Sequence, residues 1–273
     1  MTEVLVLGGT GTTGSRVAAV LAKRGIPQRQ ATRTPRASGH VRFDWDDRAT
    51  QRDALRGVTA IYLIAPIGVA DPVPFVEPFL EEALRQGVRR VVQLSSSALA
   101  EGAPGLGAVH HLVRSMMPEW TVLRPSWFMQ NFTGDHLVAR GVRDGEIVTA
   151  TGDGRVAFVD AFDIAAVAGH ALVDDDPHND EYILTGPDTL SYGDAAALIT
   201  QQIGRPVRHR SVSADEYAER IAAQGIPTEF AAVLAALDVE IRAGSEDRVT
   251  DAVERVTGRP ARSFRTFVAD EIG

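Results

Sequence analysis

The sequence contains no cysteine among its 273 residues, so it offers no disulfide framework and no thiolate nucleophile. Its apolar runs are short, and none approaches the roughly 18–20 residues needed to cross a bilayer. Basic residues are in the minority, because 28 Lys and Arg stand against 36 Asp and Glu, for a formal net charge of −8. A nucleic-acid surface normally needs a basic excess on one face. We therefore expect no membrane partner, no nucleic-acid partner and no bound metal.

Lysine is nearly missing as well, because Lys23 is the only one in the chain. The beginning of the chain does not resemble a signal peptide, since Glu3 and the strand-like segment 4–7 lead directly into glycines. Together with the absence of cysteine, this predicts a cytoplasmic protein. The length fits one large domain, or a core domain with a smaller appendage, as a monomer or a homodimer.

Short apolar runs and amphipathic segments alternate over the first 125 residues, which is the pattern of βαβ units on a parallel sheet. Strands are expected at 4–7, 28–32, 40–43, 60–64, 90–94 and 120–123, and helices at 12–24, 76–86 and 107–117.

Beyond Pro125 this alternation is lost. Two strands, 145–150 and 155–159, are expected to pair around a glycine-rich turn at 151–154. A helix at 160–173, a strand at 181–185 and helices at 192–203, 214–224, 228–243 and 249–256 are expected to follow.

A glycine-rich loop joins the first strand to the first helix, in the pattern G-x-x-G-x-x-G. Glycine permits the tight turn and a close approach of the backbone to a pyrophosphate, while the helix start supplies free N–H groups. This position favours a dinucleotide over a merely tight turn. The predicted cofactor contacts in the loop are Gly8, Thr10, Gly11, Thr12, Thr13 and Gly14.

The second strand indicates which dinucleotide is bound. An NAD-preferring unit usually has an acidic residue about 20 positions after the glycines, but no acidic residue occurs between Glu3 and Asp44. That window instead contains Arg29, Arg33 and Arg36. A guanidinium fits a 2′-phosphate well, so NADP(H) is predicted in preference to NAD(H), with Arg33 as its ligand. The alternative for Arg33 is a solvated surface arginine.

The predicted fold class is α/β, a Rossmann-type doubly wound parallel sheet with a smaller, mainly helical C-terminal substrate lobe. The expected division is an NAD(P)-binding domain at 1–125, completed by 156–173, and a substrate-binding lobe at 126–273. The lobe is expected over the carboxyl ends of the strands, where open α/β sheets bind their ligands.

Several motifs resemble the NmrA-like branch of the atypical short-chain dehydrogenase/reductases over nearly the whole chain. Within that branch, the C-terminal segment Thr257–Pro260 with Ser263 and Phe264 is similar to bacterial relatives of the ergot-alkaloid reductases that make agroclavine or festuclavine. The motifs are residues 8–14, 43–47, 64–66, 94–97, 121–132 and 158–165.

The resemblance implies roles for the matching positions. Asp44 and Trp45 would contact the adenine side, and Ala65 and Pro66 would line the ribose and pyrophosphate. Near the nicotinamide, the resemblance places Ser95, Ser96 and Pro125. On the substrate side it places Ser97, Trp127, Phe128 and Asn131.

Packing alternatives exist for several of these positions. Asp44 could cap the next turn, and Trp127 and Phe128 could be core residues. Asp160 and Asp163 are expected to cap a helix rather than to take part in chemistry.

The catalytic pair of ordinary short-chain dehydrogenases is missing. That pair is a tyrosine followed four residues later by a lysine, on the helix after the fifth strand. None of the four tyrosines lies in this helix, and the sole lysine is Lys23. His110 and His111 occupy the window instead and are candidate proton donors, although Arg114 would depress the pKa of a histidine beside it.

These observations predict an NADPH-dependent reductase for a small electrophile such as an imine, an iminium ion or a quinone. An iminium ion or a quinone takes up hydride without an enzymic acid. The alternative is a non-catalytic NADP(H)-binding redox sensor of the NmrA type, and a dehydratase or isomerase with a retained nucleotide is a third possibility.

Overall fold

The computed structural model describes residues 3–272, and the chain folds into two compact units. The first unit contains the chain up to Pro125 together with Ala161–Leu184 and Ala252–Arg259. The second contains Ser126–Asp160, Thr185–Asp251 and Pro260–Gly273. The chain thus returns to the first unit over 161–184 rather than 156–173, and a second time near its end. The cofactor and substrate roles of the two parts remain predictions.

A seven-stranded sheet forms the centre of the first unit, and all its strands are parallel, in the order β3-β2-β1-β4-β5-β6-β9. The reversal of order at β1 is the doubly wound topology. The predicted fold class is therefore confirmed. The strands are β1 (Val4–Val6), β2 (Gln28–Thr32), β3 (His40–Arg42), β4 (Ala60–Leu63), β5 (Arg90–Leu94), β6 (Glu119–Pro125) and β9 (Asp180–Leu184).

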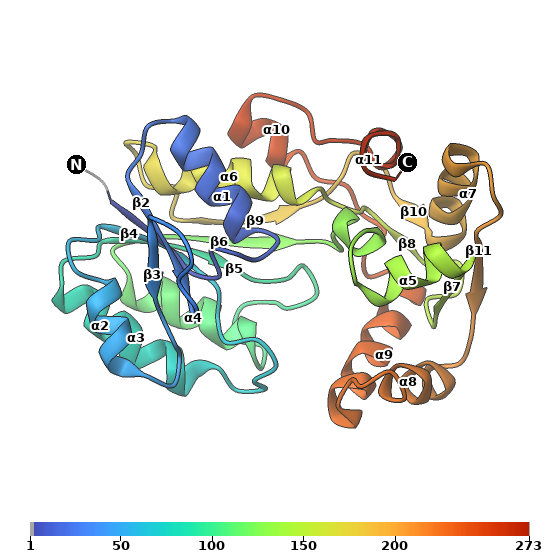
Figure 1. The fold of residues 1–273 in the computed structure, drawn as a ribbon, viewed down its shortest axis with the longest axis horizontal. Helices are drawn as coiled ribbons and strands as arrows, with labels where there is room; N and C mark the ends of the chain where they lie inside the picture. The colour runs from blue at the N-terminus through green and yellow to red at the C-terminus, as the bar shows by residue number, and fades with distance from the viewer. Residues whose placement is uncertain (1–2, 273) are drawn as a thin grey trace. The chain divides into compact units, whose positions relative to one another are not determined.

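Helices cover both faces of this sheet (Figure 1). One face carries α1 (Gly14–Lys23), α6 (Ala161–Val173) and α10 (Ala252–Thr257), and the other carries α2 (Arg48–Ala54), α3 (Val73–Arg85) and α4 (Leu106–Met116). The inner strands β1 and β4 are buried along their whole length, as expected for a parallel sheet covered on both sides. Lys23 lies exposed in the last turn of α1.

The second unit contains two small sheets rather than the hairpin predicted at 145–159. The strand β7 (Glu146–Thr149) pairs in parallel with β11 (Arg208–Ser211), whereas β8 (Arg155–Val156) pairs antiparallel with β10 (Leu190–Ser191). The turn at 151–154 therefore separates two strands that belong to different sheets. The prediction of a hairpin was wrong because the turn signal is local and the strand partners lie 34 or more residues away.

Helices and an aromatic cluster complete the second unit. Phe132, Phe158, Tyr192 and Phe264 contact one another with ring centroids 4.8–5.9 Å apart. The helices of this unit are η1 (Met129–Phe132), α5 (Leu137–Asp144), α7 (Tyr192–Ile203), α8 (Ala214–Ala222), α9 (Thr228–Arg242) and α11 (Phe264–Glu271).

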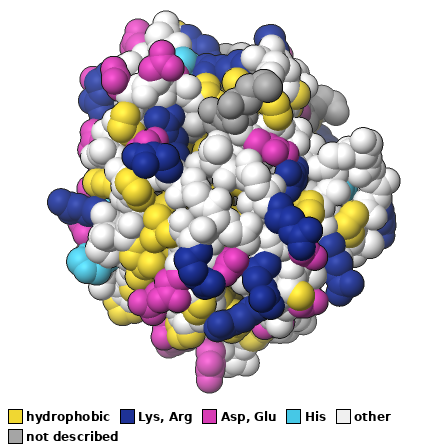
Figure 2. Space-filling view, turned by 90° about the vertical axis from the view of Figure 1, so that its left-hand side faces the viewer, with side chains coloured by type: hydrophobic (Ala, Val, Ile, Leu, Met, Phe, Trp, Pro, Cys, Tyr) yellow, Lys and Arg dark blue, Asp and Glu magenta, His cyan; other side chains and the backbone are white. Residues whose placement is uncertain are grey.

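The surface carries charges of both signs. In the view of Figure 2, Lys and Arg side chains lie interspersed with Asp and Glu. Over residues 3–272, the structure contains no helix with the length and apolar character needed to span a membrane.

One buried carboxyl group in the second unit has an unusual acidity. Asp238 lies on the buried face of α9 and is 6% exposed. Its side chain accepts a hydrogen bond from the backbone N–H of Ala150 (2.8 Å). Burial disfavours the charged form and raises the pKa of Asp238 from 3.8 to about 6.

This pKa predicts a pH-dependent stability. Between pH 4 and pH 6 the folded state keeps a proton that the unfolded state releases, so the free energy of unfolding falls as pH rises, by about 3 kcal/mol in total. Asp238→Asn keeps an oxygen for the Ala150 N–H and should remove this loss. Urea titrations at pH 4 and pH 7 should show the variant gaining on the unmodified protein at pH 7 only. Glu229→Gln, at an exposed position of the same helix, is the control; an equal gain there would contradict the assignment.

Candidate functional site

The glycine loop between β1 and α1 is built by close backbone contacts. The N–H of Gly11 donates to the carbonyl oxygen of Gly8 (2.8 Å), and Gly8 has a positive φ of 59°. A Cβ on Gly14 would lie 2.2 Å from that same carbonyl oxygen, and one on Gly9 would lie 2.6 Å from Cβ of Gln30. Side chains at these two positions are therefore excluded. Thr13 is buried, whereas Gly8, Thr10, Gly11 and Thr12 are exposed around the start of α1.

The three arginines of the β2 region differ in how they are paired. Arg29 forms an ion pair with Glu3 (2.7 Å), so its charge is already neutralised. Arg33 follows β2 and is exposed, and no ion pair links it to any residue between 3 and 272. Arg36 is also exposed. An anion at the carboxyl end of β2 would therefore meet Arg33 without breaking an internal contact.

Asp44 and Trp45 follow β3, and local contacts hold both of them. The N–H of Asp44 donates to Thr50 Oγ1 (3.0 Å), and Asp44 Oδ1 accepts from the N–H of Asp46 (3.1 Å). The bond between the N–H of Asp46 and Asp44 Oδ1 caps a turn, which is the alternative role that the sequence suggests for Asp44. The Gln51 side-chain amide donates to the carbonyl oxygens of Asp44 (3.2 Å) and Trp45 (2.9 Å).

The Trp45 ring packs edge-on against Phe43 and Phe79, with centroids 5.1 and 5.3 Å apart. Trp45 is thus part of the packing of the first unit, and a contact between it and the cofactor remains a prediction.

The ends of β4, β5 and β6 carry the other predicted cofactor residues. Ala65 is buried and Pro66 half-buried after β4. After β5, the N–H of Ser95 donates to the carbonyl oxygen of Leu123 (2.7 Å), and the N–H of Ser97 donates to that of Pro125 (3.0 Å). These bonds continue the β5–β6 pairing beyond the strand.

Arg124 holds the backbone of this serine segment in place. Its guanidinium donates to the carbonyl oxygens of Ser96 (3.5 Å) and Ser97 (3.3 Å) and pairs with Glu181 on β9 (2.8 Å). Arg124 lies inside the motif 121–132, but local sequence could not reveal this clamp, because its partners are 27, 28 and 57 residues away.

Two observations fit the first unit to a bound dinucleotide. The close approaches of Gly9 and Gly14 leave the loop backbone without side-chain cover, as a pyrophosphate requires. The buried hydroxyl of Ser95 has no hydrogen-bond partner among residues 3–272. A buried polar group without a partner is costly, and a ligand group at the end of β5 would provide one.

The two candidate proton donors on α4 lie in contrasting surroundings. His110 is 1% exposed, and its Nδ1 lies 3.7 Å from Glu181 Oε2. Burial, more than the arginines nearby, lowers the pKa of His110 and favours the neutral ring. His111 is exposed and shares Glu101 with Arg114, at 3.1 and 2.6 Å. His110 therefore lies in the core, and His111 lies in a surface ion-pair cluster.

The predicted substrate residues of the second unit follow directly after β6. Trp127 packs against the aromatic core cluster of this unit, while Phe128 and Asn131 are half-buried. Val159 pairs with this segment through its backbone. Ser97, the remaining predicted substrate residue, is buried in the first unit. The packing alternative considered for Trp127 thus has direct support.

Asp160 and Asp163 lie at the start of α6 and form ion pairs with distant arginines. Asp160 precedes α6 and Asp163 lies in its first turn, as expected. Their buried carboxylates also form ion pairs, Asp160 with Arg262 (2.7 Å) and Asp163 with Arg259 (2.8 Å). Both arginines belong to the C-terminal segment, about 100 residues further on, so local sequence could not reveal these pairs.

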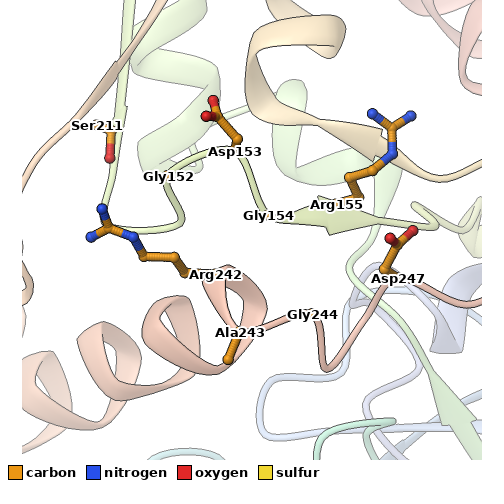
Figure 3. A pocket seen from close by; sticks show the side chains of 9 residues that line it. All are labelled: Gly152, Asp153, Gly154, Arg155, Ser211, Arg242, Ala243, Gly244 and Asp247. Atoms are coloured by element: carbon orange, nitrogen blue, oxygen red, sulfur yellow. The ribbon is translucent and has the colours of Figure 1, made fainter.

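The structure also contains a cavity that the sequence did not predict. It has a volume of about 560 Å³ in the second unit, and Arg242 at the end of α9 points toward Ser211 across it (Figure 3). Gly152 packs closely against Arg242, since a Cβ there would be 3.0 Å from the guanidinium Nε. The lining residues are Gly152, Asp153, Gly154, Arg155, Ser211, Arg242, Ala243, Gly244 and Asp247. None of the predicted site residues lines this cavity.

Comparisons with known proteins agree with this geometry. Residues 4–110 match the model of the NAD dependent epimerase/dehydratase family. The chain is 47% identical to the uncharacterized oxidoreductase YesF of Bacillus subtilis, over 97% of this chain and 94% of that protein. It is 36% identical to festuclavine synthase I of Penicillium roqueforti, over 98% of each.

A solved structure shows the same fold. It is an NADPH-dependent quinone oxidoreductase from Escherichia coli in complex with NADPH, which matches all of both chains with a TM-score of 0.83 at 23% identity. Given its relatives, its glycine loop and its doubly wound sheet, the chain belongs to the NmrA-like family of atypical short-chain dehydrogenase/reductases and is an NAD(P)-binding oxidoreductase.

Proposed function

We propose that this protein is an NADPH-dependent reductase that transfers hydride to a small electrophile such as an iminium ion, an imine or a quinone. The observation that carries the proposal is the composition of α4. This helix has no tyrosine and no lysine, and its two histidines are a neutral buried ring and a surface side chain. A helix with this composition favours a hydride acceptor that needs no proton from the enzyme.

The cofactor is proposed to lie along the carboxyl ends of the strands of the first unit. The glycine loop and the start of α1 would hold the pyrophosphate, and Arg33 would hold the 2′-phosphate. Asp44 and Trp45 would border the adenine, Ala65 and Pro66 the ribose and pyrophosphate, and Ser95, Ser96 and Pro125 the nicotinamide. When bound, NADPH supplies the hydride, and the protein supplies binding and orientation.

The acceptor is proposed to contact Ser97 and the acceptor segment, which we define as residues 127–131. Trp127 is two residues beyond Pro125, so the chain itself keeps their Cα atoms within about 7 Å. The indole of Trp127 could stack on a flat or cationic ring. An iminium carbon that receives hydride becomes a neutral amine without any proton, whereas a quinone takes its proton from solvent. The solved structure that shares this fold is named an NADPH-dependent quinone oxidoreductase, which supports the second kind of acceptor.

Cofactor choice gives the first test. Arg33→Asp replaces a charge-assisted contact by a repulsion and should cost about 2–4 kcal/mol of NADPH binding, with little change for NADH. Calorimetric titration with both nucleotides measures this. Arg56→Asp, at an exposed position of the same unit, changes the net charge equally and should leave the preference unaltered. Equal affinities of the unmodified protein for NADPH and NADH would contradict the role of Arg33.

Turnover gives the second test. The unmodified protein should oxidise NADPH in the presence of cyclic iminium ions or quinones, followed by nicotinamide absorbance. Trp127→Ala and Asn131→Ala should lower this rate while NADPH still binds. His111→Ala should leave most of it, because a general acid would contribute about 10²–10⁴-fold. NADPH binding without oxidation by any acceptor would favour the redox sensor.

A further inference from the structure

The acceptor segment is clamped to the strand-like residues before α6. The N–H of Val159 donates to the carbonyl oxygen of Trp127 (2.9 Å), and the N–H of Met129 donates to that of Val159 (2.9 Å). These two bonds fix the backbone on either side of Phe128. The next residue after Val159 is Asp160, so the clamp leads directly to a buried carboxylate.

Asp160 extends the clamp to a side chain within the acceptor segment. Gln130 Nε2 donates to Asp160 Oδ1 (2.9 Å), and Asp160 is 0% exposed. The carbonyl oxygen of Gln130 in turn accepts from the N–H and the hydroxyl of Thr133 (3.1 Å each). The short helical turn that carries Asn131 is therefore held at both ends.

The C-terminal segment supplies the charge that allows this carboxylate to be buried. Arg262 Nη1 donates to Asp160 Oδ2 (2.7 Å), and Nη2 donates to Asp270 on α11 (2.5 Å). In the same segment, the Phe264 ring packs against Phe132 at the end of η1, with centroids 4.8 Å apart. The C-terminal segment thus bonds Asp160, the partner of Gln130, and packs against Phe132, the residue directly after the acceptor segment.

Stability alone does not account for Asp160. Burying a carboxylate is costly, and replacing a buried ion pair by well-packed apolar residues is often neutral or stabilising. A carboxylate has two oxygens, however, and here one orients Gln130 while the other binds Arg262. An apolar residue could not orient an amide in this way.

A second ion pair in the same motif provides a natural comparison. Arg259, three residues before Arg262, pairs with the buried Asp163 of α6 (2.8 Å). Asp163 and Arg259 belong to the first unit, whereas Asp160, Arg262 and Gln130 all belong to the second. The two pairs match in residue types and in carboxylate burial, and the carboxylate of the Asp160 pair bonds Gln130 of the acceptor segment.

We propose that the Arg262–Asp160–Gln130 chain of contacts positions the acceptor segment, so that these three residues set the affinity for the electrophile through the placement of Trp127 and Asn131. The proposal rests on the proposed function, in which this segment binds the electrophile. The position of the segment can nevertheless be measured without turnover. Asp160, Gln130 and Arg262 are positioning residues, and Trp127 provides the spectroscopic signal.

The experiment compares Arg262→Gln with Arg259→Gln. Each substitution leaves a buried carboxylate without its arginine, and both should lower the melting temperature by several degrees. In a Trp45→Phe, Trp120→Phe background Trp127 is the only tryptophan, and acrylamide quenching of its fluorescence should rise about twofold for Arg262→Gln alone. KM for the acceptor should rise about 10-fold for Arg262→Gln alone, with kcat and the NADPH Kd within about twofold.

A rescue variant separates positioning from simple loss of folding. Asp160→Asn keeps an oxygen for Gln130 and removes the buried charge, so the double variant Asp160→Asn, Arg262→Gln should recover much of the quenching and KM of the unmodified protein. If Arg262→Gln changes quenching and KM no more than Arg259→Gln does, the pair is only structural and the proposal fails. If no acceptor is reduced, the proposed function fails, and the quenching comparison still decides the positioning.

Discussion

Parallel pairing of the seven strands is the constraint on which the candidate cofactor site depends. Because every neighbouring pair in the sheet runs in the same direction, the carboxyl ends of all strands meet at one edge. Residues that are far apart in the chain, such as Gly8, Arg33 and Ser95, follow β1, β2 and β5 and therefore lie along that edge. Backbone bonds of Ser95 and Ser97 continue the β5–β6 pairing past the end of β5, and Arg124 binds the carbonyl oxygens of this segment.

The same constraint explains how much of the fold could be predicted. Strands buried on both faces give continuous apolar runs, and 90–94 and the helix 192–203 agree with the structure residue for residue. The sequence did not reveal α2, α5 or α11, which have seven or eight residues each and are too short for a clear apolar period. The hairpin was wrong because turn residues say where a chain bends and not which strand it will pair with.

The candidate site was predictable where a motif is local, and not where it depends on distant partners. The glycine loop lies within seven residues, and its role follows from backbone geometry alone. The ion pairs of Asp160 and Asp163 join positions about 100 residues apart, so capping was the most that local sequence could suggest. The burial of His110 did have a signal, because it lies one residue from Val109 and three from Val113 on the buried face of α4.

The single lysine at the end of α1 has a practical consequence for handling the protein. Amine-directed reagents, apart from reaction at the α-amino group, have one side chain to modify, and it is exposed. The helix rises about 1.5 Å per residue, so Lys23 lies roughly 14 Å along α1 from Gly14 at the glycine loop. Coupling to a bead or a dye through this amine would place the attachment at the end of α1 that lies away from the glycine loop.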